Sequence, residues 1–89
     1  MRSRTSAEFR ARLMQLPAHV RRQARQSYRF FREDPGHPSL RFKQVRREPA
    51  VYSARVGVAY RALAVRRGED LVWFWIGHHE DYDSLLDAL

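Results

Sequence analysis

The sequence has no cysteine and no long apolar segment, and each absence excludes a class of protein. Without cysteine there is no disulfide scaffold, thiol nucleophile, iron–sulfur cluster or thiolate zinc site, which agrees with a reducing compartment. The longest stretch without a formal charge, Leu71–His79, has nine residues, whereas a membrane-spanning helix needs about 20. Arg2 and Arg4 precede no apolar run, so we expect no secretory signal. These absences predict a cytoplasmic protein with no membrane partner.

Lysine is nearly absent too, although the chain is strongly basic. The 17 basic residues outnumber 10 acidic ones, for a net charge of +7, and Lys43 is the single lysine. Residues 1–47 hold 13 basic and 3 acidic side chains, whereas residues 48–89 hold 4 and 7. A forked guanidinium binds phosphate better than a point charge does, although an arginine-rich codon bias explains the ratio equally well. The basic surplus in the first half predicts a polyanionic partner.

Length and composition predict one domain over residues 1–89. An apolar content of 44%, with 12% aromatic residues, suffices for a core. Thr5 and Glu8 have the spacing of a capping box, which predicts a helix over Ser6–Gln15. Pro17 separates it from a second predicted helix over Ala18–Arg32. The inner stripe of the second helix consists of Val20, Ala24, Ser27, Tyr28 and Phe31.

After the turn-forming segment Asp34–Pro38, the hydrophobic period changes from that of a helix to that of a strand. Four strands joined by tight turns are predicted, over Leu40–Lys43, Tyr52–Val56, Ala59–Val65 and Leu71–Ile76. We therefore expect an α+β fold, in which an N-terminal helical hairpin packs on one face of a four-stranded, mainly antiparallel sheet. The other face would be free to meet a partner, and the tail, His78–Leu89, would close with a short helix.

Arg55 and Arg61 place charges inside otherwise apolar strands, which is unfavourable unless the charges are paired or meet a ligand. A three-residue loop over 57–59 would set Arg55 opposite Arg61, whereas a two-residue loop would put them on opposite faces. Like charges directly opposite each other destabilise a strand pair, so a facing pair would indicate a bound anion. Salt bridges to Glu80, Asp81 or Asp83 would explain the two arginines equally well.

A second cluster, His78–Asp83, follows the last predicted strand through Gly77. Histidine exchanges protons near neutral pH, and tyrosine can donate a proton or orient a phosphate. A metal site is disfavoured, because adjacent residues rarely converge on one ion and no standard ligand spacing is present. The plain structural alternative is a solvated helix start with Asp81 or Asp83 as the N-cap.

A third feature is a basic stripe along the second predicted helix. It could follow a nucleic-acid backbone through phosphate contacts, although ordinary solvated helix faces look similar. Trp73, Phe74 and Trp75 could stack bases, but in an apolar strand such residues are more often core. The candidate nucleic-acid-binding residues are Arg22, Arg25, Arg29 and Arg32 on the helix, joined by Arg41 and Lys43 on the first predicted strand.

Several motifs follow one another along almost the whole chain. They are Asp34-Pro35 with Pro38-Ser39-Leu40, then Tyr52–Gly57, Tyr60–Leu63 and Trp75–Asp83. No single motif is specific, but the succession resembles the RelE/ParE superfamily of bacterial type II toxins. That resemblance implies a compact α+β toxin neutralised by a cognate antitoxin protein. The first short strand usual in the family is weak here, because Met1–Arg4 is short and carries two charges.

The resemblance implies two alternative activities. RelE-like members are mRNA interferases that cleave messenger RNA on the ribosome without a metal or other cofactor. Arg55, Arg61, His79 and Tyr82 match the catalytic motif positions in that reading. ParE-like members instead inhibit DNA gyrase and use no ribonuclease site. A non-toxic homologue that only binds an antitoxin is a third reading, and the sequence predicts the ribonuclease first.

Overall fold

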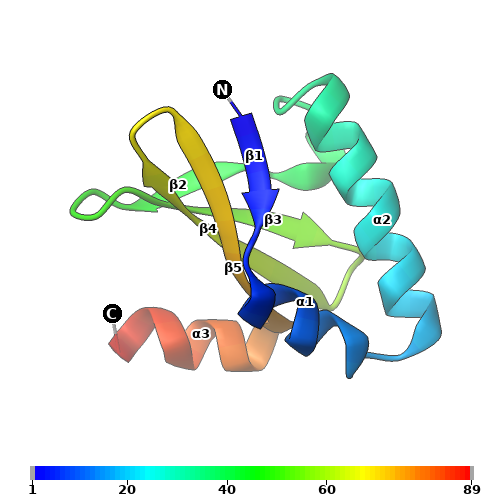
Figure 1. The fold of residues 1–89 in the computed structure, drawn as a ribbon. Coiled ribbons are helices and arrows are strands. Elements are labelled where there is room, and N and C mark those ends of the chain that lie inside the picture. Colours follow the sequence, from blue (N-terminus) through cyan, green and yellow to red (C-terminus); the bar gives the residue numbers. More distant parts are fainter. Residues whose placement is uncertain (1, 89) are drawn as a thin grey trace.

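The computed structural model describes residues 2–88, which form one five-stranded sheet with its covering helices (Figure 1). Met1 and Leu89 lie outside the described residues. The strand order is β1-β5-β4-β3-β2, in which β1 runs parallel to β5 and the other neighbours are antiparallel. In chain order the elements are β1 (Arg2–Thr5), α1 (Ala7–Met14), α2 (Ala18–Glu33), the 3₁₀ turn η1 (Pro38–Leu40), β2 (Lys43–Arg46), β3 (Val51–Val56), β4 (Tyr60–Arg67), β5 (Asp70–His78) and α3 (His79–Ala88).

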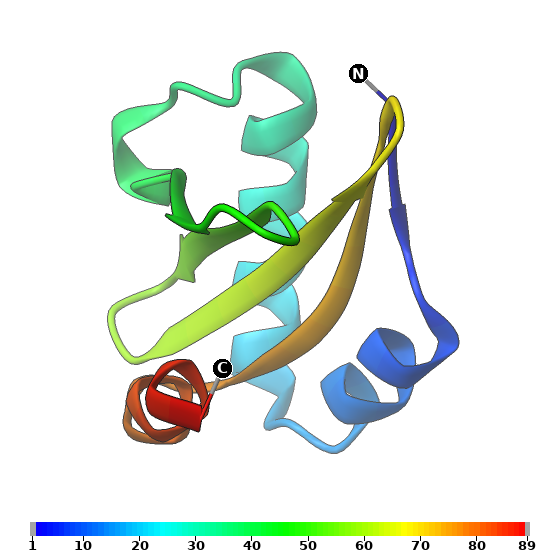
Figure 2. The same ribbon diagram turned by 90° about the vertical axis from the view of Figure 1, so that its left-hand side faces the viewer.

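The two faces of the sheet carry separate apolar clusters. Helices α1 and α2 cover one face, where Phe9 and Phe31 pack against Trp73 and Ile76. Helix α3 lies against the other face, as Figure 2 shows, with α2 behind the sheet and α3 in front. There Tyr82 belongs to a smaller cluster with Val51, Leu63 and Trp75. The predicted α+β fold and its C-terminal helix are confirmed, but the face that was expected to be free is partly covered by α3.

No helix within residues 2–88 is long and apolar enough to span a membrane.

Local sequence explains both N-terminal helices. Helix α1 begins one residue later than predicted, because the Ser6 hydroxyl, and not Thr5, accepts a hydrogen bond from the Phe9 N–H (3.0 Å). In α2 the buried residues Val20 and Phe31 lie on the predicted inner stripe. The helix ends before Pro35, which cannot continue it.

Strand β1 corrects the predicted count of four strands to five. Its four residues carry two arginines, so local propensity does not favour a strand there. Pairing with β5 stabilises it, in a register that sets Ser3 beside Leu71. The Ser3 hydroxyl also accepts a hydrogen bond from Trp73 Nε1 (2.9 Å) and bonds the Tyr28 hydroxyl (3.0 Å). The strand therefore depends on partners far away in the sequence.

The strand predicted over Leu40–Lys43 is wrong. Pro38 starts the turn η1, in which Leu40 is buried, and Arg41 adopts a left-handed backbone conformation with φ +46°. A residue in the left-handed conformation cannot continue a β-strand, so no strand passes through Arg41. The first antiparallel strand, β2, begins instead at Lys43 and pairs Lys43 with Ser53 of β3.

Both tryptophans of β5 are core residues, as we expect for aromatic residues in an apolar strand. Residues two apart in a regular strand share a face. Here Leu63 pairs with Trp75 and Ala64 with Trp73, so the register shifts by one residue at Phe74. The shift directs Trp73 to the α2 side and Trp75 to the α3 side, with 3% and 8% of their surfaces exposed.

Candidate functional site

A pocket of about 290 Å³ opens on the α3 side of the sheet and brings together all four predicted catalytic residues. We call it the strand pocket. Arg41 and Lys43, two of the six predicted nucleic-acid-binding residues, also line it. Its full lining consists of Arg41, Lys43, Ser53, Arg55, Arg61, His79, Tyr82 and Asp83.

Arg55 and Arg61 lie directly opposite each other on β3 and β4. The loop between them has three residues and begins at Gly57, whose φ of +62° suits glycine. Arg55 Nε donates to the Gly57 carbonyl (3.0 Å), and Arg61 Nη1 donates to the carbonyls of Val58 (3.2 Å) and Tyr60 (2.8 Å). Because each guanidinium has five N–H donors, both retain donors for a ligand.

No carboxylate within residues 2–88 neutralises this arginine pair. The salt bridges to Glu80, Asp81 or Asp83 that the sequence left open do not form within residues 2–88. Asp83 lines the strand pocket without pairing with its cations. Four cationic side chains and one carboxylate therefore surround the pocket, an arrangement that favours a bound anion.

Helix α3 carries the other two candidate residues into the pocket. The His79 N–H donates to the Ala59 carbonyl (2.8 Å), which ties the helix start to the β3–β4 loop. Tyr82 as a whole residue is 8% exposed. Its hydroxyl has no hydrogen-bond partner within residues 2–88 but is not buried, so it is open to the pocket. Asp81 and Asp83 lie inside the helix, so neither is the N-cap considered from the sequence.

The first residues of α3 also form a group of potential metal donors. Ligand atoms of His78, His79 and Glu80 all lie within 4.8 Å of one another. His78 Nδ1 accepts a hydrogen bond from the Glu80 N–H (3.2 Å), which occupies one of its two ring nitrogens. The expectation that the site uses no metal stays a prediction from the sequence.

Ser53 lines the strand pocket, although the sequence did not single it out. It is 3% exposed, it pairs with Lys43 across the strands, and its hydroxyl forms no hydrogen bond within residues 2–88. Its position could have been found from the sequence, because Ser53 and Arg55 are two residues apart in one strand and therefore share a face of the sheet. The Ser53 hydroxyl adds a neutral donor to the arginine pair.

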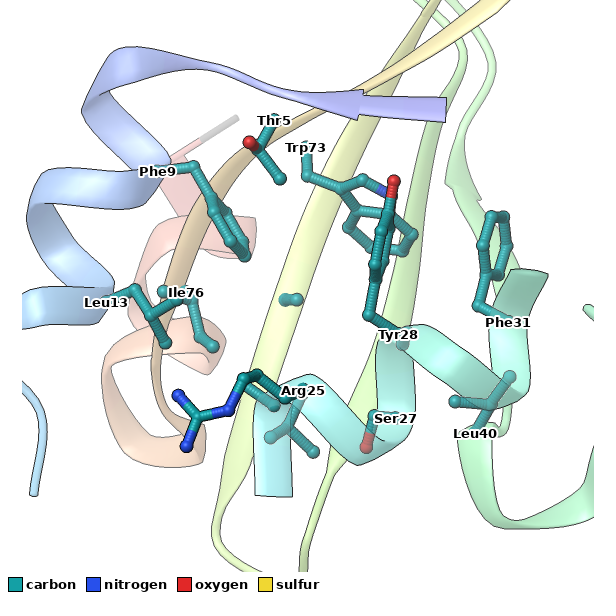
Figure 3. Close-up of a pocket in the computed structure, with 14 residues that line it drawn as sticks. Thr5, Phe9, Leu13, Arg25, Ser27, Tyr28, Phe31, Leu40, Trp73 and Ile76 are labelled. Atoms are coloured by element: carbon teal, nitrogen blue, oxygen red, sulfur yellow. The ribbon is translucent and has the colours of Figure 1, made fainter. Parts of the chain in front are cut away.

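The four predicted arginines of α2 are exposed and do not line the strand pocket. One of them, Arg25, lies at a separate apolar cleft of about 200 Å³ between α1, α2 and the sheet. Figure 3 shows its side chain extending from α2 toward Leu13 of α1. In the described part of the chain no carboxylate lines this cleft, whose larger apolar residues are Phe9, Leu13, Tyr28, Phe31, Trp73 and Ile76.

Chains from two solved toxin–antitoxin complexes share this fold. A chain of the RelB–RelE antitoxin–toxin complex from Methanococcus jannaschii matches with a TM-score of 0.70 and 17% identity, over 91% of this chain and 95% of that one. A chain of the toxin–antitoxin complex RelBE2 from Mycobacterium tuberculosis matches with a TM-score of 0.62 and 28% identity, over 86% of this chain and 95% of that one. No curated protein sequence matches.

The family follows from the sequence match. The ParE-like toxin domain matches residues 18–84. The chain therefore belongs to the ParE-like toxin family, within the RelE/ParE superfamily. The resemblance inferred from the succession of motifs is confirmed.

Proposed function

We propose that the chain is the toxin of a toxin–antitoxin system and that it cleaves messenger RNA without a metal. The observation that carries the proposal is the facing pair Arg55 and Arg61, which no carboxylate neutralises within residues 2–88. Two like charges held opposite each other lower the stability of the strand pair, and a phosphate between them would offset that repulsion. The enzyme would act in the cytoplasm, on RNA that is free or bound to the ribosome.

The chemistry proposed for the strand pocket is attack by a ribose 2′-hydroxyl on the adjacent phosphorus. The P–O5′ bond breaks, which leaves a 2′,3′-cyclic phosphate and a 5′-hydroxyl end. Arg55 and Arg61 would bind the phosphate oxygens and stabilise the charge that grows on them. His79, whose ring nitrogens form no hydrogen bond within residues 2–88, would exchange a proton with the 2′-hydroxyl or the leaving oxygen. The Tyr82 hydroxyl would position the scissile group.

The remaining cations would hold the RNA by its backbone. Arg41 and Lys43 are exposed at the strand pocket, where they can contact the phosphates next to the scissile one. The arginines of α2 lie on the helix that covers the other face of the sheet, so they would contact more distant RNA or the ribosome. They are Arg22, Arg25, Arg29 and Arg32.

An antitoxin is the proposed protein partner, because both solved neighbours come from toxin–antitoxin complexes. The apolar cleft would receive apolar side chains of an acidic, amphipathic antitoxin segment. Charge complementarity supports this occupant, since no carboxylate lines the cleft and exposed arginines follow α2 beside it. Such a segment would also compete with RNA for the arginines of α2.

Inducible expression of variants tests the ribonuclease. Arg61→Ala and His79→Ala should each relieve growth arrest, with a loss of RNA cleavage of about 100-fold or more. Mapping of RNA 5′ ends measures the cleavage, and circular dichroism checks the fold. Arg66→Ala is the matched control, because Arg66 is an exposed β4 residue outside the pocket. Full toxicity of both pocket variants would refute the catalytic assignment.

Inhibition of DNA gyrase is the alternative activity, and it needs no ribonuclease site. Pulse labelling after induction separates the two. An early loss of protein synthesis supports RNA cleavage, whereas an early DNA-damage response supports gyrase inhibition. If toxicity never appears, the chain only binds its antitoxin.

A further inference from the structure

Another pocket, of about 360 Å³, shares Arg55 with the strand pocket and has no role in the chemistry proposed above. We call it the helix pocket. It lies between α2 and the β3–β4 loop, which run side by side in Figure 1. Its lining residues are Gln23, Gln26, Ser27, Phe30, Ser39, Arg55 and Gly57. Arg55 lines both pockets, so a group bound to its guanidinium in the strand pocket lies next to the helix pocket.

The lining chemistry suits a neutral, polar heterocycle. Among the described residues, no carboxylate lines the helix pocket, and Arg55 is its single cation. The side chains of Gln23, Gln26 and Ser27 form no hydrogen bonds within residues 2–88. An amide offers both donors and an acceptor, which is the pattern of a nucleobase edge. The half-buried Phe30, stacked on His37 with ring centres 4.2 Å apart, supplies an aromatic wall.

Gly57 leaves room for one of these amides. A methyl group added to Gly57 would lie 2.6 Å from Gln23 Oε1, so the amide occupies the space that the missing side chain leaves. The amide of Gln23 therefore lies against the loop that also accepts the Arg55 hydrogen bond. When Arg55 holds the phosphate of a nucleotide, the neighbouring Gln23 amide can form hydrogen bonds with the base of that nucleotide.

We infer that the helix pocket binds a nucleobase of the RNA strand whose phosphate lies between Arg55 and Arg61. The inference rests on the proposed function, since it needs an RNA phosphate in the strand pocket. Gln23 and Gln26 contact the base edge, and Phe30 contacts the ring. Cleavage then depends on the base at this position, and these residues act on sequence preference rather than on the chemical step.

Binding of small ligands to the full chain tests the inference without relying on cleavage. Isothermal titration compares AMP, CMP, GMP and UMP with ribose 5-phosphate, which has the phosphate but no base. At least one nucleotide should bind about tenfold more tightly than ribose 5-phosphate. The double variant Gln23→Ala/Gln26→Ala should lose that advantage and keep its affinity for ribose 5-phosphate. Both changes are at exposed helix positions that tolerate alanine.

The controls separate this inference from the proposed function. Gln15→Ala, an exposed glutamine outside all three pockets, should bind as the wild type does. Arg61→Ala should weaken nucleotides and ribose 5-phosphate alike. The base pocket alone is overturned if nucleotides and ribose 5-phosphate bind equally well. It is also overturned if the double variant still binds a nucleotide more tightly than ribose 5-phosphate. If the wild type binds neither kind of ligand, both the phosphate site and the base pocket are overturned.

Discussion

Tyr82 combines two functions in one side chain, because its ring is buried and its hydroxyl is open to the strand pocket. The ring packs with Leu63 and Trp75, which fixes the position of α3 on the sheet. The hydroxyl has no partner within residues 2–88, so the fold does not depend on it. The two functions can therefore be separated by removing one oxygen atom.

Tyr82→Phe should change the free energy of unfolding by less than about 0.5 kcal/mol, because the buried ring remains. The rate of RNA cleavage should fall, since the hydroxyl that positions the scissile group is lost. Thermal denaturation and a cleavage assay measure the two effects. Tyr52→Phe, on the α2 side of the sheet, should leave cleavage unchanged. An unchanged rate in Tyr82→Phe would remove the hydroxyl from the mechanism.

On the scale of the elements, β1 depends on contacts that are distant in the sequence. Its Ser3 hydroxyl connects Tyr28 of α2 and Trp73 of β5, so one short strand joins the helical layer to the sheet. The ion pairs of Arg2 and Arg4 with Asp70 are largely exposed and contribute little. The pairing with β5 and the part-buried hydrogen bonds of Ser3, rather than the charges, hold this strand.

Ser3→Ala should lower the free energy of unfolding by about 1–3 kcal/mol, because the Trp73 indole N–H loses its acceptor. The Tyr28 hydroxyl loses the Ser3 hydroxyl but keeps its hydrogen bond to the Ser3 carbonyl (3.2 Å). Chemical denaturation measures the change. Ser84→Ala is the matched control, since Ser84 is exposed on α3, and it should stay within about 0.5 kcal/mol of the wild type. Asp70→Asn should cost less than about 1 kcal/mol. A larger effect in Asp70→Asn than in Ser3→Ala would reverse the assignment.

On the scale of the whole molecule, the basic surplus is divided between two faces. Arg41, Lys43, Arg55 and Arg61 surround the strand pocket, whereas the exposed arginines of α2 belong to the helix on the other face. A short RNA in the strand pocket would neutralise the first group only. The salt dependence of binding can therefore tell the two groups apart.

Binding of a short single-stranded RNA to the His79→Ala protein should weaken with salt, and the slope should fall by about 0.7 for each phosphate contact removed. Arg41→Gln/Lys43→Gln should lower that slope. Arg22→Gln/Arg29→Gln should leave it unchanged for the short RNA and lower it for a long one. Fluorescence anisotropy over a series of salt concentrations gives both slopes. An equal effect of the two double variants on the short RNA would contradict this division.

The sequence by itself determined the features that depend on near neighbours. The stripe of α2 follows from its helical spacing, and the apolar character of β5 marks it as a core strand. The family motifs, and with them the residues proposed as catalytic, were also visible, because each motif is a short local segment and the motifs follow one another in order. Ser53 could have been found in the same way, from its place two residues before Arg55 in a strand.

Only the tertiary structure decided the features that depend on register and distant pairing. Arg55 and Arg61 share a face because the loop has three residues, and a two-residue loop would have separated them. The shift at Phe74 sends Trp73 and Trp75 to opposite faces. The strand β1 exists through its pairing with β5 and its bonds to Trp73. Side chains in a strand alternate between the two faces of the sheet, so one residue more or fewer in a loop or bulge moves every following side chain to the opposite face. Local sequence does not encode the number of residues in that loop or bulge.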